Sequence, residues 1–209
     1  EIGSGLVGSE MCIRDRAMKI ADWENALPPY LHLAYLPKPG LVRLRIDGHH
    51  HDKTFLITEI NRRHLELCHL LGSNVLCDND IPIEEILQLE LKRRGLTLAT
   101  AESCTGGNIA HLITSVPGSS EVFNGSIVSY TNEAKMNLLG VSVENIENYG
   151  AVSRQVVEEM ASGACRALCT DCAIATSGIA GPGGGSKEKP VGTVSVSYTH
   201  LRAHETGAY

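Results

Sequence analysis

Apolar and polar residues in the first third of the chain follow two different periods. Residues 41–46 (LVRLRI) alternate apolar and basic side chains, which is typical of a strand with one buried face. Residues 52–71 carry apolar residues at helical spacing, and a short strand is predicted over 74–76. With the extended stretch that precedes them, they predict a small α+β module over residues 17–80. The inner face of its helix is predicted to carry Phe55, Leu56, Ile60, Leu67, Leu70 and Leu71.

From about residue 81, helical and strand-like segments alternate. An amphipathic helix over 83–94 is expected to end at Gly95. The alternation that follows is typical of a layered domain with helices on both faces of a sheet. We therefore predict an α/β protein whose three-layer α/β/α domain, residues 81–194, follows the small α+β module. Strands are predicted over 96–100, 126–130, 172–177 and 191–195, and further helices over 106–115, from about residue 131, and over 153–169 with Ser153 as N-cap.

The most informative turn joins the strand over 96–100 to the next helix. Its sequence, from Thr100 to Gly107, reads TAESCTGG. A helix start presents unpaired backbone N–H groups, which favour negative charge, and the two glycines let a ligand approach the backbone closely. Such a turn either binds an anion or carries a nucleophile. An ordinary capped helix start explains the same residues, because Ser and Thr are common N-caps.

Two further turns are expected beside this one, because ligands in such folds bind beyond the carboxyl ends of the strands. One carries Tyr130 and Lys135, and the other is a glycine-rich loop over 178–185. The loop can present N–H groups to a phosphate, although it lacks the Gly-Lys-Ser/Thr of a P-loop and also fits a flexible surface loop. A serine nucleophile needs a base, and no Gly-x-Ser-x-Gly elbow is present. Lys135 is permitted as that base, because burial and a helix N-terminus both disfavour its ammonium form.

A cysteine cluster and a histidine cluster are weaker candidates for a functional site. Cys165, Cys169 and Cys172 have a spacing that can hold an iron–sulfur cluster. They lie where an amphipathic helix passes into an apolar strand, so burial as small hydrophobic side chains is the favoured interpretation. Three histidines over 49–51 follow a hairpin-like Asp-Gly and are interpreted as a solvated loop rather than a metal site. His111 is expected to be a packing or surface residue.

The two ends of the chain are related at the level of DNA. Residues 7–15 can be encoded by GTG GGC TCG GAG ATG TGT ATA AGA GAC, and the reverse complement of that DNA encodes residues 196–204 without a mismatch. This inverted repeat resembles translated sequencing (transposase) adapter. Residues 1–16 and 195–209 are therefore expected to be adapter-derived and not native, and the native chain is expected to continue beyond both ends.

The net charge of the chain limits the kinds of binding partner that are expected. The chain has 18 basic and 24 acidic residues, a net charge of −6, and stays acidic without its two ends. An acidic chain argues against a nucleic-acid groove. Arg43, Arg45, Arg62 and Arg63 are interpreted as a solvated face, since no Gly-x-x-Gly clamp or aromatic platform accompanies them. No apolar run reaches the length of a membrane span, so neither a nucleic acid nor a membrane is expected as partner.

Four stretches carry a family resemblance. In chain order they are TLATAESCTGGNIAHLIT, VPGSSEVFNGSIVSYTNEAKMNLLGV, YGAVSRQVVEEMA and TSGIAGPGGGSKEKPVGTV. They make residues 81–194 similar to the C-terminal domain of the CinA (competence/damage-inducible) family, the nicotinamide mononucleotide deamidase family. Residues 17–80, with YLHLAYLPKPGLVRLRI, resemble the small domain that precedes it in full-length CinA proteins. The family's large N-terminal domain has no counterpart in this sequence, so its metal-dependent pyrophosphatase activity is not carried over.

The resemblance implies a bacterial, cytoplasmic amidohydrolase of pyridine nucleotide recycling, which converts nicotinamide mononucleotide and water to nicotinic acid mononucleotide and ammonia. It implies Ser103 as nucleophile, Lys135 as general base and Tyr130 as the tyrosine beside them. We expect N–H groups of the turn after Ser103 to hold the oxyanion and the glycine-rich loop to hold ribose or phosphate. A small-molecule nucleotide substrate and self-association are implied, and neither a cofactor nor a metal is expected. The predicted substrate-binding residues are Thr105, Gly106, Gly107, Gly178, Ala180, Gly181, Gly183 and Gly184.

Two other functions compete with this prediction. One is a catalytically idle nucleotide-binding or interaction module of a competence- or damage-linked protein. The other is a generic α/β domain in which Ser103 is only an N-cap. The intact motifs favour the enzyme, whereas the expected loss of native sequence after Val194 favours an idle module for this chain.

Overall fold

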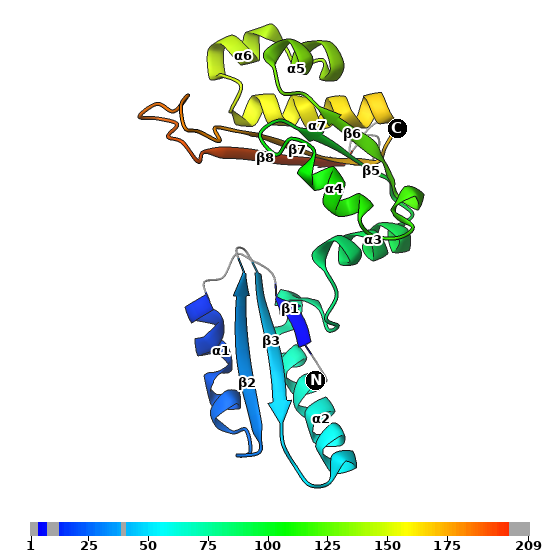
Figure 1. Ribbon diagram of the computed structural model, residues 1–209, viewed down its shortest axis with the longest axis vertical. Coiled ribbons are helices and arrows are strands. Elements are labelled where there is room, and N and C mark those ends of the chain that lie inside the picture. Colours follow the sequence, from blue (N-terminus) through cyan, green and yellow to red (C-terminus); the bar gives the residue numbers. More distant parts are fainter. Residues whose placement is uncertain (1–3, 8–12, 39–40, 201–209) are drawn as a thin grey trace, which may run out of the picture. The chain divides into compact units, whose positions relative to one another are not determined.

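The chain forms two compact units, Glu1–Ile86 and Leu87–Tyr209. The structure is a computed structural model that describes residues 4–7, 13–38 and 41–200 (Figure 1). The boundary between the units lies inside helix α3 (Ile83–Arg94), whose bounds agree with the predicted helix. None of the helices within the described ranges is long and apolar enough to cross a membrane.

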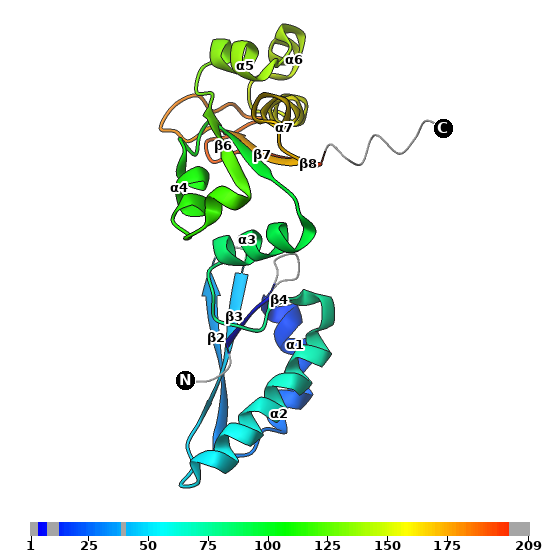
Figure 2. The same ribbon diagram turned by 90° about the vertical axis from the view of Figure 1, so that its right-hand side faces the viewer.

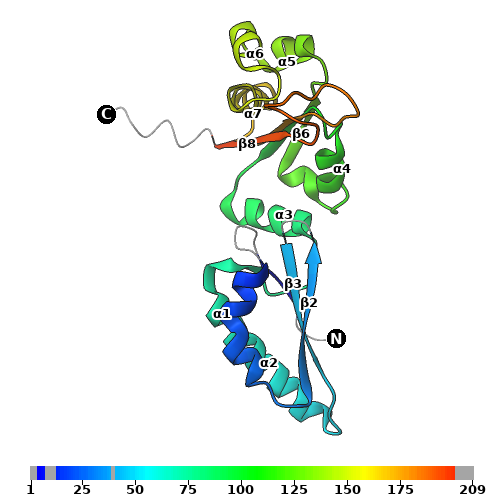
Figure 3. The ribbon, with the colours of Figure 1, turned by 90° about the vertical axis from the view of Figure 1, so that its left-hand side faces the viewer.

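The first unit is an antiparallel sheet with two helices packed on one face. The strand order is β2-β3-β1-β4, and α1 and α2 lie side by side (Figures 2 and 3). Buried and half-buried residues alternate along β3, as its period-two pattern predicts. The elements are β1 (Ser4–Val7), α1 (Ile13–Asn25), β2 (Leu31–Lys38), β3 (Leu41–Gly48), α2 (Lys53–Leu71), a 3₁₀ turn η1 (Gly72–Asn74) and β4 (Val75–Cys77).

Helix α2 begins as the sequence predicts but buries a narrower face. The Asp52 carboxylate caps it by accepting the N–H of Phe55 at 3.0 Å. Phe55 and Leu70 are 43% and 41% exposed, so their assignment to the inner face was wrong. Phe55 lies in the first turn, where its ring contacts His50 instead of the core. The residues of α2 that are buried are Ile60, Leu67 and Leu71.

The second unit has three layers around a mixed sheet, as the alternating pattern predicts. Strand β5 pairs in parallel with β6 and β7, and β8 pairs antiparallel with β7, in the order β6-β5-β7-β8. Helix α7 covers one face with α5 and α6 outside it, and α4 lies on the other face (Figure 1). The elements after α3 are β5 (Leu98–Glu102), α4 (Asn108–Thr114), a 3₁₀ turn η2 (Ser119–Glu121), β6 (Phe123–Val128), α5 (Asn132–Leu139), α6 (Val143–Tyr149), α7 (Arg154–Leu168), β7 (Cys172–Gly178) and β8 (Val194–His200).

Several boundaries differ from the predicted ones. The strand predicted over 96–100 runs from Leu98 to Glu102, so Ser103 is the first residue beyond the strand. Helix α6 is not among the predicted elements, because a seven-residue helix is too short to show a helical period. Ser153 is the N-cap of α7, as predicted, and its hydroxyl accepts the N–H of Val156.

The last strand extends beyond its predicted end at residue 195. Residues 194–200 read VSVSYTH, and their alternation has the period of a strand whatever the origin of the sequence. They pair with β7 in regular antiparallel register from Val194 to His200. Strand pairing therefore does not test the adapter origin of residues 1–16 and 195–209, which stays a prediction.

Small residues bring α5, α7 and the sheet close together. Ala99 and Ala101 on β5 and Ala173 and Ala175 on β7 are fully buried in the core cluster that includes α7. At Gly163 of α7, an added Cβ would lie 2.0 Å from the carbonyl oxygen of Leu139. The end of α5 thus rests directly on the backbone of α7, and this close contact fixes α5 against α7.

Candidate active site

Three turns meet at the carboxyl edge of the parallel strands, as the sequence predicts. The N–H of Ser103, beyond β5, donates to the carbonyl oxygen of Thr176 in β7 at 3.0 Å. The N–H of Ser129, beyond β6, donates to the carbonyl oxygen of Glu102 in β5 at 2.8 Å. These hydrogen bonds join the ends of the three strands. They place Ser103 beside the start of α5 and beside the glycine-rich loop.

Ser103 and Lys135 are in direct contact at this edge. Lys135 Nζ lies 3.1 Å from Ser103 Oγ, within hydrogen-bonding distance. Both side chains are buried, at 1% exposure for Lys135 and 7% for Ser103. Lys135 Nζ also donates to the carbonyl oxygens of Ser129 at 2.8 Å and Tyr130 at 3.5 Å. The two residues that the sequence paired as nucleophile and base are therefore brought together.

The start of α5 positions Lys135. Thr131 is the N-cap, and its hydroxyl accepts the N–H of Ala134 at 3.1 Å. The carbonyl of Thr131 accepts the N–H of Lys135 itself, so the lysine lies within the first turns of the helix. The opposite end of α5 rests on Gly163 of α7. Capping at one end and close packing at the other thus hold the lysine in place.

The surroundings of Lys135 favour its neutral amine. Burial lowers the pKa of Lys135, and the negative charge of a nearby Cys104 thiolate opposes this by a smaller amount. The positive N-terminal end of α5 also disfavours the ammonium form. A neutral amine has two hydrogens and one lone pair. If the hydrogens go to the carbonyls of Ser129 and Tyr130, the lone pair faces Ser103 Oγ, which is the arrangement a general base requires.

Two of the N–H groups predicted to hold the oxyanion, those of Gly106 and Gly107, already have hydrogen-bond acceptors in the turn after Ser103. The N–H of Gly106 donates to the carbonyl of Ser103 at 3.1 Å, and the N–H of Gly107 donates to Glu102 Oε2 at 3.0 Å. Because both donors are used within the turn, they are not free to hold an oxyanion. Within the described chain, the N–H groups of Cys104 and Thr105 have no hydrogen-bond acceptor. These two groups are the donors that the turn leaves for a ligand.

The glycine-rich loop begins in contact with the same turn. A Cβ on Gly178 would lie 2.8 Å from Cys104 Sγ, so glycine is required for this close approach. The loop connects β7 to β8 at the end of the sheet where α4 begins, and it is drawn in orange in Figures 2 and 3. Gly181 and Gly184 have φ values of 82° and 85°, a left-handed conformation that favours glycine. Residues 180–186 are exposed and therefore accessible to a ligand.

Tyr130 and Thr105 are placed differently from the dyad. The Tyr130 side chain is 73% exposed, and only its backbone carbonyl contacts Lys135 Nζ. Its hydroxyl therefore does not belong to the buried pair in this structure. The Thr105 hydroxyl lies 2.8 Å from that of Thr176, so it ties the turn to β7. The sequence patterns identified both positions but did not indicate which way their side chains point.

Comparison with known proteins identifies the family. The family model of the CinA C-terminal domain matches residues 80–208. The chain belongs to the CinA family. It is 45% identical over 182 residues to a CinA-like protein of Flavobacterium psychrophilum, with 87% of this chain and 44% of that protein covered. A CinA-like protein of Cytophaga hutchinsonii is 43% identical over 179 residues, with 86% and 43% covered. The chain thus spans less than half the length of these curated relatives.

Solved structures of CinA-type proteins share the fold. The competence/damage inducible protein CihA from Agrobacterium tumefaciens is 45% identical, with a TM-score of 0.56 over 57% of this chain and 73% of that chain. A CinA superfamily protein from Escherichia coli is 35% identical, with a TM-score of 0.53 over 56% and 74%. The mixed α/β architecture of the second unit is therefore that of the CinA superfamily.

The cysteines at the end of α7 do not converge in this CinA chain. Cys165 is buried, Cys172 is half-buried, and Cys169 is exposed at the helix C-cap with φ of 51°. Burial raises the pKa of the Cys165 and Cys172 thiols. No group of three or more metal-ligating side chains able to hold an ion occurs in the described ranges. His111 is exposed on α4, one of the two settings expected for it.

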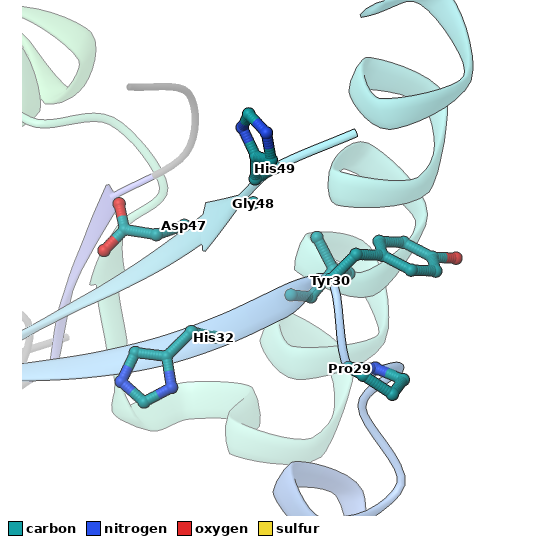
Figure 4. A pocket seen from close by; sticks show the side chains of 7 residues that line it. Pro29, Tyr30, His32, Asp47, Gly48 and His49 are labelled. Carbon is teal, nitrogen blue, oxygen red and sulfur yellow. The ribbon is translucent and has the colours of Figure 1, made fainter. Parts of the chain in front are cut away.

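A hollow of about 670 Å³ lies in the first unit, by the hairpin of β2 and β3. Its lining includes His32, Asp47 and His49. Figure 4 shows the imidazoles of His32 and His49 pointing away from each other. The side chains do not converge on a common point, so this hollow lacks the geometry of a metal or catalytic site.

Glu102 belongs to the candidate site but was not predicted from the sequence. Its side chain is fully buried, and its carboxylate accepts N–H groups from the start of α4. One signal for it was present in the sequence. A glutamate that ends an apolar strand just before a helix is well placed to face the positive end of that helix.

Proposed function

We propose that this protein is an amidohydrolase that converts nicotinamide mononucleotide and water to nicotinic acid mononucleotide and ammonia. Ser103 is the nucleophile and Lys135 the general base. The observation that carries the proposal is the 3.1 Å contact between Ser103 Oγ and Lys135 Nζ in a buried setting. The resemblance of the surrounding motifs to nicotinamide mononucleotide deamidases supports the choice of substrate.

The first half of the reaction forms an acyl-enzyme. Neutral Lys135 takes the proton of the Ser103 hydroxyl as Oγ attacks the carboxamide carbon of the pyridine ring. The free N–H groups of Cys104 and Thr105 are the donors nearest in sequence to the nucleophile, so we assign them to the tetrahedral oxyanion. Lys135 then returns the proton to the leaving nitrogen. The C–N bond breaks, and ammonia departs.

The second half reverses these roles. Water attacks the ester carbon of the acyl-enzyme while Lys135 accepts the proton of the water. The C–O bond to Ser103 breaks, the proton returns to Oγ, and nicotinic acid mononucleotide leaves. Lys135 carries the proton in both halves, because the exposed Tyr130 hydroxyl does not contact the dyad. The glycine-rich loop over 178–185, which is exposed from residue 180, offers a place for the ribose or phosphate.

The decisive experiment measures both products and the covalent intermediate. The protein is incubated with nicotinamide mononucleotide, ammonia is followed by a coupled assay, and the nucleotide products are separated by chromatography. We expect equal amounts of ammonia and nicotinic acid mononucleotide, and an acyl group on Ser103 after acid quenching and mass spectrometry. Turnover without that adduct and undiminished in Ser103→Ala would contradict the nucleophile assignment.

The idle nucleotide-binding module predicts a different result from the same preparation. A folded protein that binds nicotinamide mononucleotide by calorimetry, yet releases no ammonia, would favour the idle module. Melting temperature with and without nucleotide serves as the control for folding, because a bound ligand stabilises the native state.

A further inference from the structure

The carboxylate of Glu102 is held mainly by the start of helix α4, with longer contacts to the hydroxyls of Thr100 and Ser126. Glu102 Oε2 accepts the N–H groups of Gly107 at 3.0 Å and Ile109 at 3.1 Å, and Oε1 accepts the N–H of Ala110 at 2.8 Å. The side chain is fully buried. The carboxylate therefore fills the position at which the unpaired N–H groups of a helix start would bind an anion.

Glu102 stays charged in this setting. Burial by itself would raise its pKa, but hydrogen bonds from the Thr105 hydroxyl and from the N–H groups of α4 outweigh burial, so the pKa of Glu102 is lowered. A buried charge is retained only when its partners compensate for the lost hydration. The partners of Glu102 all belong to strand β5, strand β6 and the turn and first residues of α4.

Glu102 holds the turn that carries Ser103 at two points, through its backbone carbonyl and through its side-chain carboxylate. The backbone carbonyl of Glu102 accepts the N–H of Ser129, which fixes the end of β5 to the end of β6. The side chain of Glu102 turns back to hold Gly107, which fixes the far end of the turn. Between them, the Thr105 hydroxyl meets that of Thr176. The direction of the Ser103 side chain is thereby determined from both sides.

We propose that Glu102 is the positioning residue of the Ser103 nucleophile. Its buried carboxylate locks the turn over 103–107 so that Ser103 Oγ rests on Lys135 Nζ. It also uses the N–H groups of Gly107, Ile109 and Ala110, so an anionic group of the substrate cannot bind at the start of α4. The effect on nicotinamide mononucleotide turnover rests on the proposed function, whereas the effect on Ser103 reactivity does not.

The second unit offers a matched control in Glu159 of α7. Its carboxylate accepts the N–H of Ser142 at 2.9 Å and the side-chain amide of Asn145 at 2.8 Å, so it too holds a helix start, that of α6. It makes no hydrogen bond to either member of the dyad in the described structure. Both Glu102→Gln and Glu159→Gln remove a carboxylate charge that holds a helix start. Glu102 lies beside the nucleophile, whereas Glu159 contacts the start of α6.

The experiment measures covalent labelling of Ser103 by a fluorophosphonate, with the site identified by mass spectrometry. Thermal unfolding and the kcat and KM for nicotinamide mononucleotide are measured alongside. We expect Glu102→Gln to slow labelling by about 100-fold, the cost of a misplaced reacting group, and to lower kcat more than it raises KM. Glu159→Gln is expected to lower the melting temperature while labelling stays at the wild-type rate.

Equal labelling rates in wild type and Glu102→Gln would overturn the proposal, as would equal losses in the two Gln variants. If Glu102→Gln does not fold, Glu102→Asp decides, because it keeps the charge but is one methylene too short to reach all three N–H groups. Slower labelling in Glu102→Asp than in Glu159→Asp supports positioning, and equal rates overturn it. A wild-type protein that is labelled at Ser103 but leaves nicotinamide mononucleotide intact refutes the proposed function alone.

Discussion

The two units of this protein bury different kinds of side chain. Every buried residue that the structure describes in the first unit is apolar, and the charged groups of α2, such as Arg62, Glu59 and Glu66, pair at its surface. The second unit buries Lys135 and Glu102 almost completely. Burial of an ionisable group is costly, so a fold that keeps two of them near one edge of a sheet points to function there.

The second unit accommodates its two ionisable groups in opposite ways. Glu102 keeps its charge because the N–H groups of α4 replace the water that it loses, and its pKa is lowered. Among the described residues, the hydrogen-bond acceptors of Lys135 are carbonyl and hydroxyl oxygens and no carboxylate, and its pKa is also lowered, which favours the neutral amine. A glutamate that keeps its charge and a lysine that gives up its proton more readily suit their proposed roles, because one positions and the other accepts a proton.

The largest expected effect comes from removing the buried lysine. Lys135→Ala should reduce ammonia release by about 10²–10⁴-fold, the usual contribution of a general base. The matched control is Lys92→Ala, because Lys92 is a partly exposed lysine of α3 paired with Glu121 at 2.9 Å. Initial rates at saturating substrate, with circular dichroism to verify folding, measure both. A similar loss of ammonia release in the two variants would contradict a specific role of the buried Lys135.

A cavity in the apolar core of the first unit should affect stability instead of chemistry. Ile46 of β3 is 2% exposed and packs in the core of that unit. Ile46→Ala should lower the free energy of unfolding of the first unit by about 2–5 kcal/mol. Urea unfolding followed by Trp23 fluorescence reports on this unit, which contains the tryptophan of the chain. Ser103 labelling that falls together with this transition would show that the two units do not behave separately.

The pH dependence of Ser103 labelling should report the lowered pKa of Lys135. Below that pKa the lysine is protonated and cannot act as a base, so the rate should rise about tenfold per pH unit and level off above it. The midpoint should lie below about 10.4, the ordinary value for lysine. The negative charge of a Cys104 thiolate raises the pKa of Lys135, so Cys104→Ser should move the midpoint further down. A midpoint at the ordinary lysine value would contradict a neutral Lys135.

The same proton affects stability with a defined sign. Because the folded-state pKa of Lys135 is lowered, the unfolded chain binds more protons between that pKa and the ordinary one. The contribution of Lys135 to the free energy of unfolding therefore rises with pH across this window. Denaturant midpoints of wild type and Lys135→Met, compared over the same pH range, isolate this contribution.

The smallest effects are expected from two helix caps, one in each unit. Asp52 caps α2 and Thr131 caps α5, each by accepting one backbone N–H. Replacement of either by Ala should cost about 1 kcal/mol of stability. Only Thr131→Ala should also slow Ser103 labelling, because α5 carries Lys135. Equal labelling in the two variants, at equal stability, would show that the α5 cap does not help to position the base.

The sequence predicted the locations of the site residues better than their interactions. Strand ends and helix starts follow from hydrophobic period and capping residues, so the turns bearing Ser103 and Lys135 were found. The occupied N–H groups of Gly106 and Gly107 could not be found in this way, because their acceptors depend on the path of the turn. The exposure of the Tyr130 side chain could not be predicted from the sequence either, since a motif position does not give a side-chain direction.

By itself, the sequence determined the alternation of helices and strands after residue 81 and the resemblance to the CinA family. These features follow from local periodicity, capping and motif order. Only the tertiary structure decided that Lys135 Nζ meets Ser103 Oγ away from water and that Glu102 holds the start of α4. Burial, pKa and the choice of hydrogen-bond partner depend on residues that are distant in sequence, and the packing of β5, β6, β7 and α5 brings them together.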